Sequence, residues 1–203
     1  RRSLGWFAIA GVLVATLSLL SLLSLETTSI LYDTFRLDSF AKAFKLILMI
    51  GSLLVLLLAE SYRPKKGLEE TRGEFYYLFL TALLGAMVMT SSGDLITMFI
   101  GLELLSISSY ILAGIRKRNL QSNEAAMKYV INGSIATAIT LFGMSYLYGL
   151  TGSTNLKEMG SIMDQLLNGQ FQYLFGIAFF MMLVGFSFKI ASAPFHMWAP
   201  DVY

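Results

Sequence analysis

Six apolar segments, each close to twenty residues long, occupy most of this chain of 203 residues. A helix rises about 1.5 Å per residue, so about 20 apolar residues are needed to cross the hydrocarbon core of a membrane. Backbone polar groups find no water in lipid, so each segment is predicted to form a spanning α-helix. The predicted spans are residues 4–25, 39–59, 75–92, 95–115, 125–150 and 174–199.

The composition agrees with a membrane protein and excludes several other classes. Hydrophobic residues make up 56% of the chain and charged residues 14%, whereas about a quarter of a soluble domain is charged. There is no cysteine and only one histidine, which leaves no ligand set for an iron–sulfur cluster, haem or zinc. The net charge of +2 is small and gives no support to nucleic-acid binding.

The predicted fold class is therefore all-α: a polytopic transmembrane helix bundle formed by a single domain over residues 1–203. The sixth span contains Pro194, so the predicted bundle has a broken helix near its C-terminal end. The chain begins with Arg1 rather than Met and stops at Tyr203 within an apolar element. We expect it to be an incomplete fragment of a longer protein.

The basic residues predict an orientation in the membrane. Six spans place most loop Lys and Arg on one side, and by the positive-inside rule that side, with the N-terminal end, is cytoplasmic. We expect Lys42 and Lys45, at the other side, to snorkel towards water along their long stems. The predicted cytoplasmic set is Arg1, Arg2, Arg63, Lys65, Lys66, Arg72, Arg116, Lys117 and Arg118, against Arg36 and Lys157 in the opposite loops.

Two local signals describe the loops. The short turn at residues 91–94 joins the third and fourth spans into a helical hairpin, with Asp94 as the predicted N-cap of the fourth. Apolar residues at helical spacing between Leu156 and Leu167 predict a short amphipathic helix. A capping box formed by Asn155 and Glu158 would start it, and Gly169 would end it. We expect this helix on the membrane surface or against a neighbouring subunit.

Glu103 lies inside the fourth span, eight residues after Leu95 and so about 12 Å along the helix. A charge at that depth costs about 2.5–3.5 kcal/mol on insertion scales, and such residues mark functional sites. Ser106 and Tyr110, three and seven residues later, share its face. This polar stripe is predicted to face other helices or water. The alternative is a carboxylate that only joins two helices.

Lys189 lies in the sixth span, about fifteen residues in and five residues before Pro194. Proline removes a hydrogen bond and clashes with the preceding turn, so the helix is predicted to kink or break just after Lys189. Broken helices at membrane depth occur where ions are moved. We predict that Lys189 and Glu103 form a proton switch. A static ion pair that locks two helices is the alternative.

Two further residues are candidates with open alternatives. Lys128 lies four residues after Glu124, the spacing of an ordinary surface ion pair, but a second and more cytoplasmic relay site is equally compatible. His196 follows the Pro194 break by two residues. Its ordinary pKa suits proton relay, although a lone histidine is more often structural.

Four motifs give the chain a family resemblance: "GLELLSISSYIL" at 101–112, "EAAMKYVINGS" at 124–134, "YGLTGSTNL" at 148–156 and "FKIASAPFHMWAPDVY" at 188–203. They resemble the antiporter-like membrane subunits of respiratory complex I, the proton-pumping NADH:quinone oxidoreductase. The ending is more similar to the subunit N branch of that family than to the L and M branches. The first three spans match only in pattern.

The resemblance implies a fourteen-helix subunit with two inverted five-helix repeats, of which this chain would supply helices two to seven. It places the family's functional glutamate at Glu103, its lysines at Lys128 and Lys189, and a histidine after the break at His196. Glu103 would tune the protonation of Lys189, and protons would pass on to groups beyond Tyr203. The implied function is proton translocation within an NADH-quinone oxidoreductase, coupled to quinone reduction.

The same resemblance implies that the chain carries no cofactor of its own. No second histidine, cysteine or carboxylate stands at ligand spacing from His196, so no metal site is predicted. NADH, FMN, iron–sulfur clusters and quinone would bind to partner subunits. The partners would be other membrane-arm subunits and the lipid bilayer, with a bacterial inner (plasma) membrane as the expected location. Two alternatives remain at this point. One is a subunit of a cation/proton antiporter or of a related ferredoxin- or hydrogenase-linked complex, and the other is a structural membrane scaffold.

Overall fold

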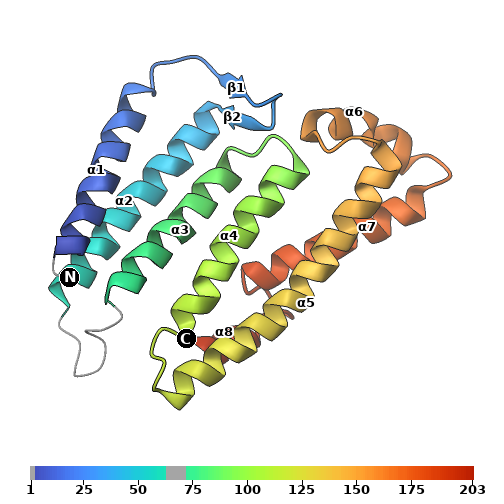
Figure 1. The fold of residues 1–203 in the computed structure, drawn as a ribbon. Coiled ribbons are helices and arrows are strands. Elements are labelled where there is room, and N and C mark those ends of the chain that lie inside the picture. The colour runs from blue at the N-terminus through green and yellow to red at the C-terminus, as the bar shows by residue number, and fades with distance from the viewer. Residues whose placement is uncertain (1–2, 63–71) are drawn as a thin grey trace.

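The computed structural model describes residues 3–62 and 72–203. Six of its helices are long and apolar enough to cross a membrane, and they run alternately up and down the bundle (Figure 1). The predicted helical bundle is confirmed. The spanning helices are α1 (Ser3–Ser21), α2 (Ser39–Ser61), α3 (Arg72–Thr90), α4 (Leu95–Ala113), α5 (Leu120–Thr151) and α7 (Gln172–Lys189). Two short helices, α6 (Leu156–Leu167) and α8 (Trp198–Val202), complete the set.

The sixth span differs most from its prediction. Instead of continuing to residue 199, α7 ends at Lys189 and the backbone turns away, with Ala191 in the left-handed region at φ 50°. The predicted break is therefore confirmed, but Lys189 closes a helix rather than lying in the middle of one. Residues 190–197 form turns, and α8 then returns against α5.

Caps account for most of the helix ends. The Asp94 carboxylate accepts a hydrogen bond from the backbone N–H of Thr97 at 2.7 Å, as predicted. Asn119 caps α5 in the same way, so α5 begins five residues earlier than predicted. The predicted capping box on α6 is confirmed for Asn155 and wrong for Glu158. Asn155 does accept a hydrogen bond from the N–H of Lys157 at 2.9 Å, but Glu158 instead accepts one from the Ser153 hydroxyl.

The two ends of the bundle carry different connections. One end, the hairpin end, carries two antiparallel strands, β1 (Thr28–Ile30) and β2 (Phe35–Leu37), together with the turns at residues 91–94 and 152–155 (Figure 1). The opposite end carries Arg72 and the basic turn at residues 116–118. The other basic residues assigned to that side, Arg1, Arg2, Arg63, Lys65 and Lys66, lie outside the described residues.

The small hairpin of β1 and β2 was not predicted, and it buries two lysines that were expected to reach water. Lys42 and Lys45 do not snorkel: they are only 4% and 6% exposed. The Lys42 ammonium donates a hydrogen bond to the Leu25 carbonyl at 2.5 Å, and the Lys45 Nζ atom lies 4.6 Å from the centre of the Phe35 ring. The segment between α1 and α2 folds over both stems, so the lysines find partners beneath it.

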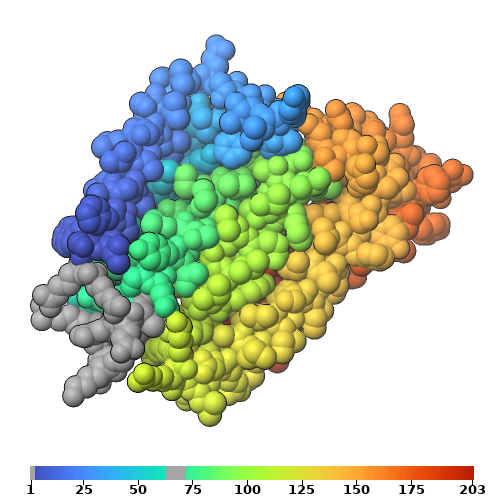
Figure 2. Space-filling view, viewed as in Figure 1, coloured from blue at the N-terminus to red at the C-terminus, as the bar shows by residue number. Residues whose placement is uncertain are grey.

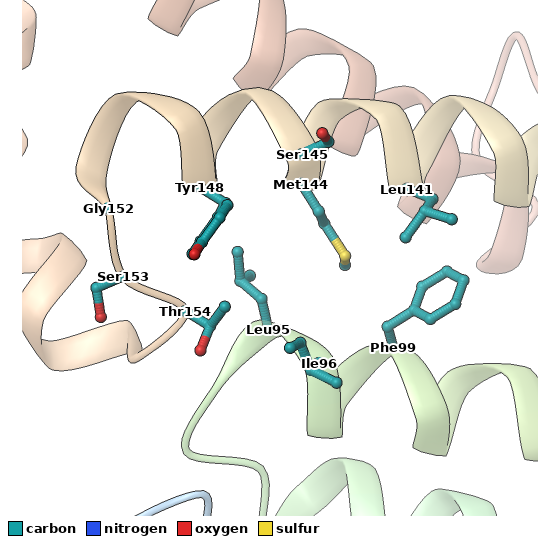
Figure 3. Close-up of a pocket in the computed structure, with 10 residues that line it drawn as sticks. All are labelled: Leu95, Ile96, Phe99, Leu141, Met144, Ser145, Tyr148, Gly152, Ser153 and Thr154. Atoms are coloured by element: carbon teal, nitrogen blue, oxygen red, sulfur yellow. The ribbon is translucent and has the colours of Figure 1, made fainter.

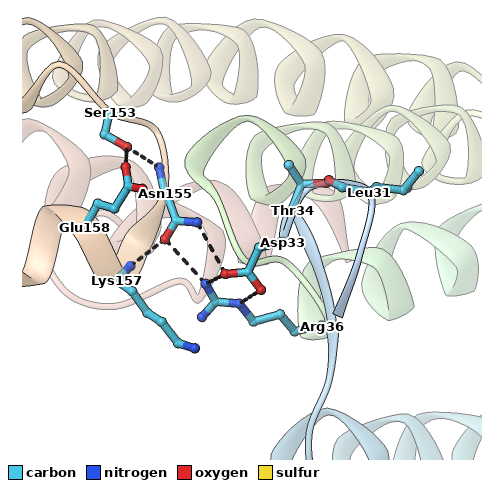
Figure 4. Close-up of polar contacts among 8 residues, drawn as sticks. All are labelled: Leu31, Asp33, Thr34, Arg36, Ser153, Asn155, Lys157 and Glu158. Atoms are coloured by element: carbon cyan, nitrogen blue, oxygen red, sulfur yellow. Dashed lines mark hydrogen bonds and ion pairs between the residues drawn. The ribbon is translucent and has the colours of Figure 1, made fainter. Parts of the chain in front are cut away.

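Polar contacts tie the loops of the hairpin end together (Figure 4). Arg36 donates hydrogen bonds to Asp33 through two nitrogens and reaches the Asn155 side chain at 3.3 Å. Backbone bonds join the same loops, from Arg36 N to Ser91 O at 2.7 Å and from Leu156 N to Gly93 O at 3.1 Å. Three connections distant in sequence are therefore held as one layer.

Small residues let the helices approach closely where the core is tightest. In α3 and α4, a methyl group at Gly85 would lie 2.7 Å from the Gly101 carbonyl oxygen. In α5 and α7, one at Gly185 would lie 1.6 Å from the Thr140 hydroxyl oxygen. Such close backbone approach is typical of membrane helix packing. In the space-filling view the side chains of α3, α4 and α5 lie against one another on the face shown (Figure 2).

Candidate functional site

The site is built where α7 ends beside α4. Lys189 is the last residue of α7, so its ammonium lies at the negative end of the helix dipole, where a cation is favoured. Its side chain is 17% exposed. Three of its contacts come from a single stripe on α4, formed by Glu103, Ser106 and Tyr110. The face predicted from the i, i+3, i+7 spacing is therefore the face that meets Lys189.

The two charges approach each other without sharing a short hydrogen bond. Nζ of Lys189 lies 3.9 Å from Oε1 of Glu103, whose side chain is 22% exposed. The same carboxylate oxygen accepts a hydrogen bond from the Thr137 hydroxyl of α5 at 2.8 Å. The contacts of the carboxylate thus lie on both neighbouring helices.

Neutral hydroxyls hold the ammonium more closely than the carboxylate does. Lys189 donates to the Ser106 hydroxyl at 2.6 Å and to the Tyr110 hydroxyl at 3.1 Å. Nζ also lies 5.5 Å from the centre of the Tyr110 ring, within the range of a cation–π contact. The lysine is therefore held by α4 hydroxyls, and Glu103 acts on it through space.

The structure places Lys128 outside this group, nearer the end of the bundle that carries Arg72 and residues 116–118. Its ammonium lies 2.9 Å from Glu124, the i, i+4 partner that the spacing predicts, and 3.5 Å from Asp201 of α8. The lysine side chain is 43% exposed. The cluster therefore fastens α8 to the start of α5.

His196 lies in the turns between α7 and α8 and is exposed. Its backbone carbonyl accepts a hydrogen bond from Ala199 N at 3.0 Å. Within residues 3–62 and 72–203, no hydrogen bond or ion pair from its imidazole is present. Of the four predicted site residues, the structure thus brings Glu103 and Lys189 together and leaves Lys128 and His196 on the flanks.

Two residues of the site were missed by the sequence analysis. Thr137, which bonds to Glu103, carries no signal in the sequence beyond its place in a spanning helix. Trp198 donates its indole N–H to the Phe188 carbonyl at 3.0 Å, one residue before Lys189, and stacks on Tyr129 of α5 with ring centres 4.6 Å apart. The tryptophan thus pins the chain after the break to α5 and to the end of α7.

A separate hollow of about 630 Å³ lies between α4 and α5 near the hairpin end (Figure 3). Its lining is mostly apolar and includes none of the four predicted site residues. In the described part of the chain, no three His, Asp or Glu side chains are grouped as metal ligands would be. The lining residues are Leu95, Ile96, Phe99, Leu141, Met144, Ser145, Tyr148, Gly152, Ser153 and Thr154.

The family is identified by a match over the part of the chain that contains Glu103 and Lys189. Residues 92–203, more than half of the sequence, match the family model described as NADH:quinone oxidoreductase/Mrp antiporter, transmembrane. The chain belongs to this family. The matched region contains α4, α5 and α7, and so both charges of the site. The family resemblance predicted from the motifs is confirmed, and the chain is an integral membrane protein.

Curated relatives in this family agree with the predicted subunit N branch. The chain is 65% identical over its full length to NADH-quinone oxidoreductase subunit N of Geobacillus sp. (strain WCH70). It is also 65% identical to the subunit of that name from Anoxybacillus flavithermus. It covers 41% and 40% of these relatives, so it spans about two fifths of their length.

Solved structures give the same fold. Respiratory complex I from Thermus thermophilus contains a chain that matches 99% of this one, with a TM-score of 0.79 and 33% identity, over 42% of its own length. The Mrp complex from Dietzia sp. contains a chain that matches over 100% of this one and 39% of its own length. Its TM-score is 0.76 and its identity 19%, a likeness of fold alone.

Proposed function

We propose that this chain forms part of a proton-translocating subunit N of an NADH-quinone oxidoreductase, with Glu103 and Lys189 as its proton site. The proposed location is a bacterial inner membrane. The end of the bundle that carries Arg72 and residues 116–118 would face the cytoplasm, since it holds most of the described basic loop residues. The high identity to subunits of that name supports the assignment.

One observation carries the proposal: two opposite charges lie 3.9 Å apart within the spanning helices, at a helix break. At an effective dielectric constant of about 20, unit charges at that distance attract by about 4 kcal/mol. A small change in their separation therefore changes how firmly Lys189 holds its proton. Desolvation opposes the charged form and the carboxylate favours it, so the protonation of Lys189 follows the geometry.

The loose geometry favours a switch over a static fastening. A buried ion pair that serves only stability needs short and well-directed hydrogen bonds to offset desolvation. Here the carboxylate oxygen bonds to Thr137 and the ammonium to Ser106, so neither charge depends on the other for its shortest contact. Either group can then change its protonation while its neighbours remain in place.

Lys128 and His196 are proposed as flanking relay groups. Lys128 stands among Glu124 and Asp201 at the proposed cytoplasmic end, where a carboxylate cluster can collect protons. His196 is exposed after the break, and an imidazole can both donate and accept a proton. Both are secondary to the pair formed by Glu103 and Lys189.

Electron transfer is assigned to other chains. We propose that NADH, FMN, iron–sulfur clusters and quinone bind to partner subunits, and that other membrane-arm subunits and lipid surround this one. The sequence offers no cysteine and one histidine, so its own residues suit proton binding rather than redox chemistry. Conformational or electrostatic change caused by quinone reduction would then reach the Glu103–Lys189 pair.

The test is proton uptake per electron pair in membrane vesicles that carry the assembled complex. Wild type is compared with Lys189→Ala and with Lys157→Ala, a matched control at an exposed lysine of α6. Electron transfer from NADH to quinone is measured separately, and assembly is checked by the amount of intact complex. We expect Lys189→Ala to lose proton uptake and Lys157→Ala to keep it.

Two results would contradict the proposal. Normal proton uptake and turnover in an assembled Lys189→Ala complex would make the lysine structural, as the scaffold alternative requires. Transport that depends on a sodium gradient and not on NADH would favour the antiporter alternative.

A further inference from the structure

The two hydroxyls that hold Lys189 differ in what else they bond to. The Ser106 hydroxyl accepts from Lys189 and also donates to the Leu102 carbonyl at 2.6 Å, so its single proton is already committed. The Tyr110 hydroxyl accepts from Lys189 at 3.1 Å. The Ser106 and Thr137 hydroxyls also lie close to it. No hydrogen bond donated by the phenol is found in the described part of the chain, so its proton can turn towards Lys189.

We propose that Tyr110 takes part in the proton site: its hydroxyl hydrogen-bonds to Lys189 in both protonation states of the lysine. This inference rests on the proposed function. A charged ammonium has only protons to offer and needs acceptors, whereas a neutral amine has a lone pair and can accept a bond. A phenol can serve both, because it is at once a donor and an acceptor.

No covalent bond of the tyrosine changes during proton transfer, and its hydroxyl keeps a hydrogen bond to Lys189 before and after it. When Lys189 releases a proton to the next carrier, its nitrogen gains a lone pair, and the Tyr110 O–H rotates to donate to that nitrogen. When the lysine takes up a proton again, the hydrogen bond reverses. Ser106 stays an acceptor throughout, because its own proton is held by Leu102. Glu103 in its ionised form only accepts, so it cannot replace the phenol.

The fold holds the phenol at this position through a notch in α5. A methyl group at Gly133 would lie 2.1 Å from the Tyr110 hydroxyl oxygen and 2.6 Å from the carbon that bears it, so only glycine admits the ring. Tyr129, four residues earlier, packs edge-to-face on the Tyr110 ring with centres 4.6 Å apart. Tyr110 is 6% exposed, so it is fixed between α4 and α5.

The titratable groups that face Tyr110 come from three helices. Among the residues that the structure describes, they are Glu103 on its own helix, Lys189 at the end of α7 and Tyr129 of α5. Among these, Lys189 is the group that hydrogen-bonds to the phenol. A change in the pH dependence of proton uptake on loss of the hydroxyl would therefore report on the lysine.

The deciding variant is Tyr110→Phe, which keeps the ring and the cation–π contact but removes the hydroxyl. It is compared in assembled complexes with Tyr77→Phe, a matched control at an exposed tyrosine of α3. We expect Tyr110→Phe to lower proton uptake per electron pair severalfold. We also expect the pH profile of proton uptake to move to lower pH by up to about one unit. Both states of Lys189 lose a bond to the phenol, but the charge-assisted bond of the ammonium is the stronger of the two.

A second variant approaches the same contact from α5. Gly133→Ala would push the phenol off Lys189, whereas Gly149→Ala on the same helix meets nothing within 4 Å. We expect the first to move the pH profile as Tyr110→Phe does, and the double variant to add little, since both remove one interaction. The Gly149→Ala control should behave as wild type.

The outcomes separate this inference from the proposed function. If Lys189→Ala abolishes proton uptake while Tyr110→Phe keeps both the wild-type uptake and the wild-type pH profile, the role of Tyr110 is overturned and the proposed function stands. If Lys189→Ala itself pumps normally, both are overturned. If Tyr110→Phe lowers uptake without moving the pH profile, the tyrosine is only structural and the inference fails.

Discussion

Lys189 of α7 and Glu103 of α4 lie 3.9 Å apart between Nζ and Oε1, and each has its shortest bond elsewhere. The carboxylate accepts from Thr137 at 2.8 Å, and the ammonium donates to Ser106 at 2.6 Å. The two charges therefore interact electrostatically across a gap and are not joined by a short hydrogen bond. A gap of this kind can open or close by small movements of α5 or α7.

Replacing Thr137 by valine is expected to weaken proton translocation, because Glu103 loses the donor that draws it towards α5. A hydrogen bond to a charged group contributes about 1.5–3 kcal/mol, so without it the carboxylate would move towards Lys189. The lysine would then hold its proton more firmly. Valine has nearly the same shape, so the bundle should still assemble. The measurement is proton uptake per electron pair in vesicles, with electron transfer scored alongside.

Thr137→Ser provides the rescue, since it keeps the hydroxyl. Thr81→Val is the matched control, because the Thr81 hydroxyl bonds to the Tyr77 carbonyl of its own helix. Equal uptake in Thr137→Val and wild type would show that this hydrogen bond does not set the gap.

Substituting Gly185 by alanine is expected to force α5 and α7 apart. The added methyl group would lie 1.6 Å from the Thr140 hydroxyl oxygen and 3.2 Å from the Ala136 carbonyl oxygen. Overpacking of this kind costs about 1–3 kcal/mol. Gly185 is one helical turn before Lys189, so the lysine should shift as well. Thermal unfolding of the detergent-solubilised protein should show a lower midpoint.

Gly176→Ala is the control on the same helix, because a methyl group there meets nothing within 4 Å. It should leave the midpoint unchanged or raise it slightly, since alanine favours a helix over glycine. An unfolding midpoint for Gly185→Ala at or above that of Gly176→Ala would argue against close packing of α5 on α7.

The contact between Arg36 and Asp33 predicts an acid-sensitive element at the hairpin end. Hydrogen bonds from Arg36 hold the pKa of Asp33 below its ordinary value of 3.8. A lowered folded-state pKa stabilises the fold above the unfolded value, and that stabilisation is lost as the pH falls through the folded value. Asp33→Asn should therefore lower the unfolding midpoint at pH 7, and its effect should shrink as the pH falls below 3.8.

The matched control is Asp164→Asn, at an exposed carboxylate on α6. It should change the midpoint little at either pH. A difference between Asp33→Asn and wild type that is as large at pH 3 as at pH 7 would contradict an electrostatic origin.

Several parts of the structure followed from the sequence because they depend on neighbouring residues only. The six spans, the Asp94 cap and the break after Lys189 are of this kind. A helix in lipid satisfies its own backbone, so hydropathy and caps are enough to locate it. The polar stripe of Glu103, Ser106 and Tyr110 also followed, since helical spacing alone places three such residues on one face.

Other features depended on contacts between distant segments. Thr137 could not be assigned to Glu103, because the two residues stand 34 positions apart on different helices. The prediction that Lys42 and Lys45 snorkel was wrong, because the segment that covers them is a hairpin that bonds to the distant turn at residues 91–94. Neither contact leaves a periodic signal in the chain.

Local signals in the chain are thus enough to predict a membrane helix bundle with a carboxylate and a lysine at depth and a break beside the lysine. The packing of the helices sets the distance of 3.9 Å between the two charges and brings the α4 hydroxyls to the lysine. The physical reason is that helix formation is governed by local hydrogen bonds and hydropathy. The distance between helices is instead set by how side chains such as Thr140 fit against glycines on a neighbouring helix.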